Sequence, residues 1–295
     1  MIKPNFFIIG APKCGTTAVA RWLSQHSDVY FSPRKEPHFF NTDGITEIDT
    51  LQEYEALFAD ATDKHAAVGE GSTTYLYSCN AVSNILEYSP NAKFIVCLRN
   101  PIEMAPALHG ERLAQGRESE SDFERAWCLQ PERIQGRHIP ATVAAEPYRL
   151  FYGEQCKLGM HLNRLYSQVP RSKVHTILLD EIRIAPERVY SQVLDFLNLP
   201  DQQKSIDFSP VNTSKRTRST TIARMLRYSV MLKKKLGISR SFGTARMLKG
   251  INVTRAPRIP LTIELKRELS DYFESDVRLL ATLIDRDLTD WLRKP

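Results

Sequence analysis

The chain has 295 residues, of which 42% are hydrophobic and 25% are charged. These values are ordinary for a folded protein, and they exclude a disordered, collagen-like or coiled-coil chain. The apolar runs are shorter than the roughly 18 residues of a membrane-spanning helix, so we expect a cytoplasmic protein. The five cysteines are widely spaced without a C-x-x-C pair, which favours free thiols over a zinc or dithiol site.

Positive charge is concentrated in one stretch of the chain. The 40 basic and 34 acidic residues give a net charge of +6. Residues 208–263 contain thirteen of the basic residues and no acidic one, so the rest of the chain carries a net charge of −7. Such a local excess indicates either a solvated basic face or a site for an anion.

The predicted elements alternate between short apolar strands and amphipathic helices. We expect strands at residues 6–10, 93–98 and 174–179, and helices at 16–26, 186–197 and 261–283. Continuous apolar strands separated by helices predict an α/β fold, in which a parallel sheet is flanked by helices. We expect a single domain over residues 1–295, with 208–260 as a basic excursion over the edge where ligands bind.

The turn after the first predicted strand has the features of a phosphate-binding loop. Gly10 and Gly15 enclose the residues Ala-Pro-Lys-Cys, and Thr16 and Thr17 open the following helix. Such a turn aims backbone N–H groups and the helix dipole at one point, and Lys13 adds a full charge. Lys13 precedes the second glycine, which departs from the Walker pattern. The alternative is an ordinary turn with a surface lysine.

Two further segments extend this pattern. Residues 35–40 read Lys-Glu-Pro-His-Phe-Phe, and Arg-Asn-Pro at 99–101 follows the second predicted strand. Together with the loop, these segments resemble the sulfotransferases that use 3′-phosphoadenosine 5′-phosphosulfate (PAPS), such as the heparan sulfate sulfotransferases and their bacterial relatives. Shorter matches follow in family order at residues 69–75, 122–126, 152–155, 196–199 and 287–291.

The resemblance implies transfer of a sulfuryl group from PAPS to a hydroxyl of a small-molecule, lipid or saccharide acceptor, without a metal ion. The product is 3′-phosphoadenosine 5′-phosphate (PAP). The family usually has a serine where this chain has Ala107, and we expect basic residues near position 215 to compensate for it. The cofactor-binding residues implied are Lys13, Cys14, Gly15, Thr16, Thr17, Arg99, Lys215 and Arg216.

The catalytic residues follow from the demands of the reaction. Sulfuryl transfer needs positive charge around the oxygens of the leaving phosphate, and a base for the proton of the acceptor. Lys13 supplies charge, and the resemblance implies that Glu36 is the base. His38 is the second candidate, because side chains two residues apart face the same way in an extended segment. The alternatives are a Glu36 paired with Lys35 or Arg34, and a His38 that only packs.

Other functions remain open at this point. A small-molecule kinase would share a phosphate loop, and a sulfotransferase fold could bind the nucleotide with weak or no turnover. The basic stretch has few aromatic residues, so we do not expect a nucleic-acid partner. Residues 222–235 form a basic amphipathic pattern, which predicts either packing on the domain or peripheral membrane contact. The acceptor and the oligomeric state stay undefined.

Overall fold

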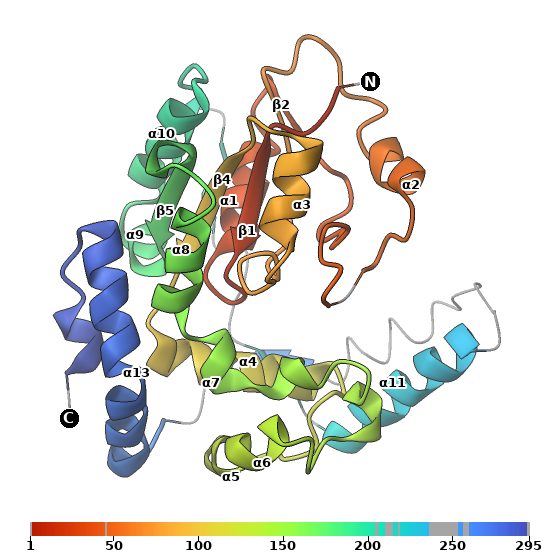
Figure 1. Ribbon diagram of the computed structural model, residues 1–295, viewed down its shortest axis with the longest axis vertical. Helices are drawn as coiled ribbons and strands as arrows, with labels where there is room; N and C mark the ends of the chain where they lie inside the picture. The colour runs from red at the N-terminus through yellow and green to blue at the C-terminus, as the bar shows by residue number, and fades with distance from the viewer. Residues whose placement is uncertain are drawn as a thin grey trace. The chain divides into compact units, whose positions relative to one another are not determined.

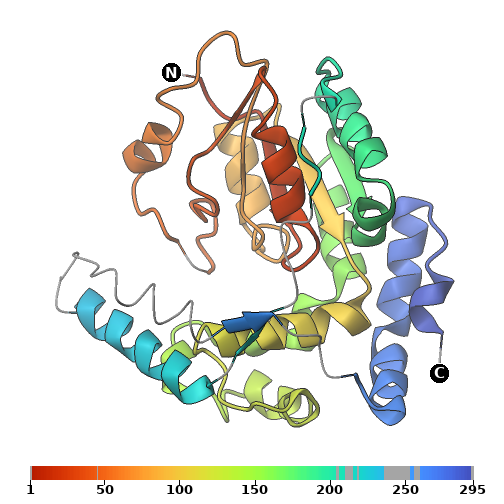
Figure 2. The same ribbon diagram turned by 180° about the vertical axis from the view of Figure 1, so that it is seen from behind.

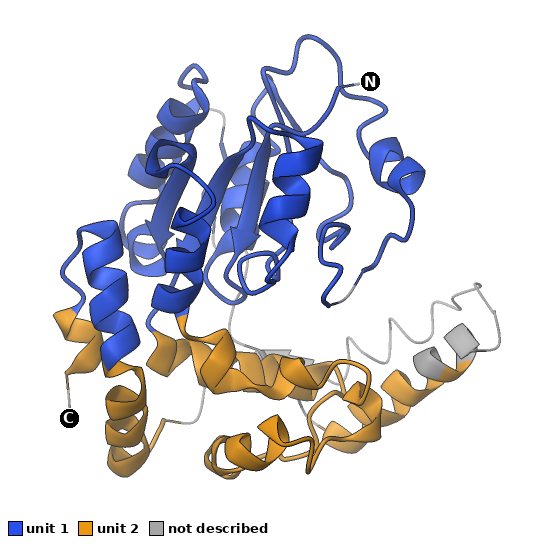
Figure 3. Ribbon diagram, in the orientation of Figure 1, with its two compact units in different colours: residues 1–100, 158–211, 275–288 blue, residues 101–157, 212–274, 289–295 orange. Residues whose placement is uncertain are grey.

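The computed structural model describes residues 2–44, 46–203, 206–209, 215–217, 219–235, 253–255 and 260–293. The chain forms two compact units, which Figure 3 shows in different colours. The first unit consists of residues 1–100, 158–211 and 275–288, and the second of residues 101–157, 212–274 and 289–295. Residues 236–252 of the predicted basic excursion lie outside the described residues.

A five-stranded parallel sheet forms the centre of the first unit (Figure 1). The strand order is β2-β3-β1-β4-β5. The strands are β1 (Phe6–Gly10), β2 (Val29–Phe31), β3 (Ala67–Gly71), β4 (Lys93–Leu98) and β5 (Val174–Leu178). Every residue of β1 is buried, as expected for an apolar strand that is covered on both faces. The predicted α/β fold with a helix-flanked parallel sheet is confirmed.

Helices cover both faces of this sheet. Figure 1 shows α3 and α8 in front of the strands, and Figure 2, from behind, shows α1 on the opposite face. The helices of this unit are α1 (Thr16–Leu23), α2 (Leu51–Ala56), α3 (Ala81–Tyr88), α8 (Leu158–Tyr166), α9 (Leu179–Ile184) and α10 (Pro186–Leu197). The predicted helix at 16–26 ends three residues early, because tight turns at Gln25 and His26 replace the helical ladder.

The second unit is mainly helical. Its elements are α4 (Pro101–Ala114), α5 (Phe123–Cys128), α6 (Gln130–Ile134), α7 (Tyr152–Gln155), α11 (Thr220–Lys235) and the antiparallel pair β6 (Lys215–Thr217) and β7 (Val253–Arg255). The last long helix, α13 (Ile263–Ile284), starts two residues after its predicted start. The hydroxyl oxygen of Thr262 accepts the N–H of Leu265 at 3.2 Å and so caps the helix at that point.

The second unit contains a buried ion pair between Glu118 and Arg133. Both guanidinium Nη groups of Arg133 donate to the two carboxylate oxygens of Glu118, at 2.7 and 2.8 Å. The Tyr152 hydroxyl donates to the same carboxylate at 2.7 Å. At most 1% of either charged side chain is exposed. Two buried opposite charges joined by two parallel hydrogen bonds hold each other in the ionised form.

None of the described helices is both long enough and apolar enough to cross a membrane.

Replacing Glu118 by alanine tests how much breaking this buried pair lowers the free energy of unfolding. The change leaves the Arg133 guanidinium buried without its carboxylate, and we expect the free energy of unfolding to fall by about 3–5 kcal/mol. Glu132→Ala is the matched control, because Glu132 contacts the exposed side chains of Arg137 and His138. Its loss should stay below about 1 kcal/mol. Urea unfolding measures both values, and equal losses would contradict the assignment.

Candidate active site

The loop between β1 and α1 has a backbone that only glycine allows at its two ends. A Cβ atom at Gly10 would lie 2.7 Å from the Leu76 Cβ atom, closer than real Cβ contacts. Gly15 has a φ of 95°, a left-handed conformation that side chains disfavour. Lys13 also has a positive φ, of 66°, and its side chain is exposed. The predicted loop is therefore a tightly specified turn, with its lysine directed to solvent.

The start of α1 offers backbone N–H groups to a ligand. The first backbone hydrogen bonds of this helix run from Ala18 and Val19 to the Gly15 carbonyl, at 2.9 and 3.4 Å. The N–H groups of Thr16 and Thr17 therefore precede the helical ladder. N–H groups in this position, together with the helix dipole, favour an anion. Thr16 is buried and Thr17 is half-buried.

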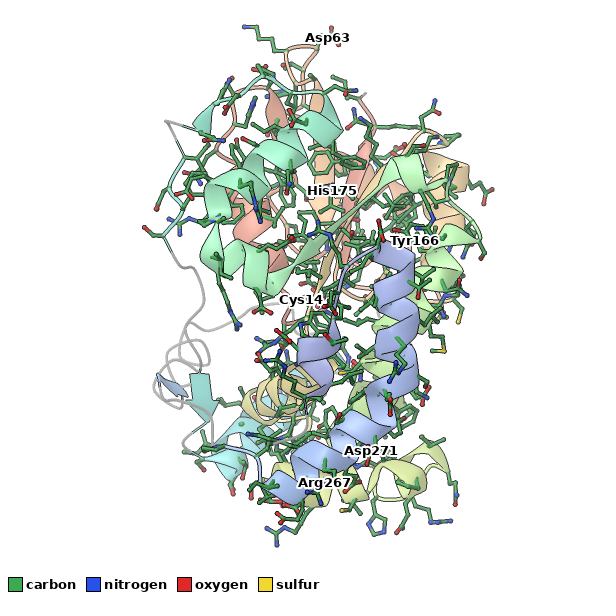
Figure 4. The ribbon with its side chains drawn as sticks, turned by 90° about the vertical axis from the view of Figure 1, so that its left-hand side faces the viewer. Cys14, Asp63, Tyr166, His175, Arg267 and Asp271 are labelled. Atoms are coloured by element: carbon green, nitrogen blue, oxygen red, sulfur yellow. The ribbon has the colours of Figure 1, made fainter. Side chains whose placement is uncertain are left out.

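Cys14 lies in the loop between β1 and α1, and Figure 4 labels its position. Cys14 is fully buried, and its Sγ donates to the Pro12 carbonyl at 3.4 Å. Burial and the neighbouring Cys97 raise the pKa of this thiol, so it stays protonated at neutral pH. Cys14 is therefore a small residue that fills the turn. Contact between Cys14 and a cofactor stays a prediction.

Arg99 brings the second predicted phosphate motif to the loop. It follows β4 directly, and only 5% of the residue is exposed. Its Nη1 donates to the Lys13 carbonyl at 3.2 Å. The two motifs, separated by 86 residues, are therefore in direct contact. A buried guanidinium beside a helix N-terminus makes this corner of the first unit suited to anionic groups.

The predicted base is held at one carboxylate oxygen by several polar groups. Glu36 Oε2 accepts hydrogen bonds from the Thr73 hydroxyl at 2.7 Å and from the Thr73 N–H at 3.2 Å. His38 Nε2 lies 3.1 Å from the same oxygen. The other oxygen, Oε1, lies 3.4 Å from Lys35 Nζ. The structure thus brings Glu36 and His38 together, and it also forms the Glu36–Lys35 pair that the alternative interpretation proposed.

These contacts keep Glu36 ionised. Burial favours its neutral form, but the hydrogen bond with His38, the charge of Lys35 and the Thr73 hydroxyl outweigh burial. The pKa of Glu36 is lowered to about 2 as a result. The imidazole of His38 is fixed as well, because its Nδ1 lies 2.8 Å from the Thr74 hydroxyl oxygen. Glu36 and His38 therefore form a carboxylate–imidazole pair with a defined orientation.

The turn after β3 supplies side chains that the sequence alone did not place in the site. These are the hydroxyls of Ser72, Thr73 and Thr74; β3 itself adds the buried carboxyl of Glu70. Ser72 Oγ donates to Glu70 Oε2 at 2.8 Å and accepts the backbone N–H of His38 at 3.1 Å. The sequence pointed to this turn only through the match at residues 69–75, which indicated the family but not these contacts.

The remaining predicted residues are not brought to the loop by any described contact. The backbone of Lys215 and Arg216 forms part of β6, and their side chains lie outside the described part of the chain. Ala107 is buried within α4 of the second unit. Their roles toward a 3′-phosphate stay predictions. Across the described ranges, no group of three or more His, Cys, Asp or Glu residues could hold a metal ion.

Comparison with known proteins finds sulfotransferases both by sequence and by structure. Residues 3–243 match the sulfotransferase domain family. The crystal structure of a sulfotransferase from Alicyclobacillus acidocaldarius is 26% identical with a TM-score of 0.73, covering 99% of this chain and 100% of that chain. The sulfotransferase domain from the curacin biosynthetic pathway shares the fold, with a TM-score of 0.51 at 15% identity, over 97% of this chain and 99% of that one.

Curated relatives are larger proteins. The bifunctional heparan sulfate N-deacetylase/N-sulfotransferase 1 of Caenorhabditis briggsae is 25% identical over 218 residues, or 70% of this chain and 24% of that protein. Carbohydrate sulfotransferase 15 of Rattus norvegicus is 29% identical over 143 residues, covering 34% of this chain and 26% of that protein. The chain thus spans about a quarter of the length of these relatives.

The low pKa of Glu36 predicts that part of the stability of the fold is lost at acid pH. Its folded value of about 2 lies below the ordinary value of 4.5, so ionised Glu36 stabilises the fold above pH 4.5. This contribution, about 3 kcal/mol, is lost as the pH falls toward 2. Glu36→Gln lacks it. We expect the stability gap between wild type and variant to narrow on acidification, and a constant gap in urea unfolding at several pH values would contradict this.

Proposed function

Because the chain belongs to the sulfotransferase domain family, we propose that it transfers a sulfuryl group from PAPS to a hydroxyl of its acceptor. The observation that carries this proposal is the hydrogen bond from Arg99 to the Lys13 carbonyl, which joins the two phosphate motifs. Lys13 and the N–H groups of Thr16 and Thr17 bind the 5′-phosphosulfate end of the donor. Arg99 binds its 3′-phosphate.

The residues of the loop fit such a donor on physical grounds. The exposed Lys13 ammonium, the N–H groups at the start of α1 and the Arg99 guanidinium are all donors of positive character. They stabilise the negative charge that develops on the leaving phosphate oxygens during transfer. Since these protein groups supply the charge, the proposal includes no metal ion.

Two groups are candidates to accept the proton of the acceptor hydroxyl. Glu36 is the first candidate, because it is ionised and, among the described residues, its Oε1 contacts Lys35 alone, at 3.4 Å. The contact between Glu36 and His38 favours a second arrangement, in which the imidazole accepts the proton and Glu36 stabilises the imidazolium that results. The two arrangements place the essential group on different side chains, and kinetics can distinguish them.

The acceptor is proposed only by class. The relatives act, by their names, on carbohydrates or heparan sulfate, and we propose a saccharide, small-molecule or lipid hydroxyl for this chain. Peripheral membrane contact also stays a prediction. It is favoured by the exposed side chains of Ile222, Met225, Tyr228 and Leu232 on the basic helix α11. The cytoplasmic location and the lack of a nucleic-acid partner likewise remain predictions.

Calorimetry with PAP tests the donor assignment. We expect wild type to bind PAP in the micromolar range or tighter, and Lys13→Ala to weaken binding roughly 10- to 100-fold through the lost charge-assisted contact. Lys64→Ala is the matched control, since Lys64 is an exposed lysine of the same unit. Its affinity should equal that of wild type. Absence of heat with PAP, combined with tight ATP binding, would instead support a kinase.

Release of PAP from PAPS, measured across a panel of hydroxyl acceptors, tests the base. Glu36→Gln keeps the size of the side chain but removes its charge, and we expect kcat to fall by about 10²–10⁴. PAP affinity should stay nearly unchanged. Glu47→Gln, at an exposed carboxylate paired with Arg34, is the control and should retain full activity. An active Glu36→Gln beside an inactive His38→Asn would transfer the role to the imidazole.

A further inference from the structure

Glu70 is a buried carboxyl that the proposed transfer does not use. It lies on β3 and is 0% exposed. Its Oε2 accepts the Ser72 hydroxyl at 2.8 Å, whereas Oε1 has no hydrogen-bond partner among the described residues. The equally buried Tyr54 hydroxyl also lacks one. An ionised carboxylate with an unsatisfied buried oxygen is unfavourable, and a proton on Glu70 removes this cost.

The two neighbouring carboxyls have opposite environments. Glu36 Oε2 meets the His38 imidazole and the N–H and hydroxyl of Thr73, whereas the hydrogen-bonding groups at Glu70 are the neutral hydroxyls of Ser72 and Tyr75. Burial raises the pKa of Glu70 to about 7, and the charge of Glu36 adds to the rise. The hydrogen bonds of the Ser72 and Tyr75 hydroxyls lower this pKa but do not outweigh burial. Close carboxyls with different surroundings take different protonation states. Glu36 is therefore the charged member, and Glu70 is mainly protonated below about pH 7.

The groups facing Glu70 leave its negative charge poorly compensated. They are Lys35 and Glu36 from the segment after β2, Tyr54 from α2, and Ser72 and Tyr75 from the turn after β3. Lys35 is the cation that faces both carboxyls, and it already lies 3.4 Å from Glu36 Oε1. An ionised Glu70 therefore competes with Glu36 for the same ammonium group.

Glu70 is also connected to the backbone of His38. The Ser72 hydroxyl that donates to Glu70 accepts the His38 N–H at 3.1 Å. His38 has a φ of 52°, a left-handed conformation that residues other than glycine adopt rarely. Such a conformation persists when surrounding contacts determine it. The chain of contacts from Glu70 through Ser72 is one that fixes His38 in this conformation.

We propose that Glu70 is a positioning residue for the Glu36–His38 pair, acting as a neutral carboxyl whose deprotonation lowers sulfuryl transfer. The neutral carboxyl accepts the Ser72 hydroxyl, which in turn accepts the His38 N–H. It does not attract Lys35, so the ammonium group stays with Glu36. This inference rests on the proposed function, because it assigns regulation by pH to the same site.

The kinetic test compares wild type with Glu70→Gln, which mimics the neutral carboxyl. We expect kcat of wild type to fall roughly ten-fold between about pH 6 and pH 8, as a group titrating near pH 7 loses its proton. Glu70→Gln should show no such fall, while its KM for PAPS stays at the wild-type value. Glu53→Gln, at an exposed carboxylate of α2, should keep the wild-type profile. A Glu70→Gln profile identical to wild type would overturn the proposal.

A second measurement needs no acceptor. In NMR spectra, the Glu70 carboxyl carbon should titrate near pH 7, and the backbone amide of His38 should show a component with the same midpoint. That component should vanish in Glu70→Gln and in Ser72→Ala, which breaks the connecting hydroxyl. A Glu70 carboxyl that is ionised throughout this range, or a His38 amide that ignores it, would overturn the proposal. Absence of transfer to every acceptor would overturn the proposed function instead, and these spectra would still decide the role of Glu70.

Discussion

The parallel pairing of β1 with β4 is the constraint on which the candidate site depends. The register places Phe6 beside Lys93 and Ile8 beside Ile95, and the Ala11 N–H continues the pairing to the Cys97 carbonyl at 2.7 Å. Parallel strands end at the same edge of a sheet, so the loop after β1 and the residue after β4 emerge together. The contact of Arg99 with this loop follows from strand register, and a slip by one residue would abolish it.

The position of the Glu36–His38 pair depends in the same way on β3, which lies on the other side of β1. The pairing of Phe7 with Glu70 fixes where β3 ends, and its following turn carries three hydroxyl side chains in succession. The segment around Glu36 has no regular secondary structure, and these hydroxyls hold it. The central strands therefore position Arg99 and the loop on one side of β1 and the Glu36–His38 pair on the other.

The strands that could be predicted from sequence are the continuous apolar ones. β1 contains four and β4 five adjacent apolar residues, and burial on both faces requires that composition. The partly buried β5 contains three adjacent apolar or β-branched residues after His175. β3 was missed, because Ala-Val-Gly-Glu-Gly combines two glycines with a carboxylate, and these types are depleted in strands. Its place between β2 and β1 overrides that preference. Helix α4 was missed as well, since Pro106 inside it indicates a break.

The charged members of the site could be named from their motifs, but their protonation states could not. Glu36 and Glu70 are the same residue type, and nothing in their local sequence separates a pKa of about 2 from one of about 7. Burial raises the pKa of both, but at Glu36 the His38 imidazole, the charge of Lys35 and the Thr73 hydroxyl outweigh it, whereas at Glu70 the Ser72 and Tyr75 hydroxyls do not. Serine and threonine are common, and no sequence pattern marks the ones that will contact a carboxyl. Their role is determined only when the strand register brings them to one. The chemistry of this site is therefore decided by the neutral side chains at the end of β3 as much as by the charged residues of its motifs.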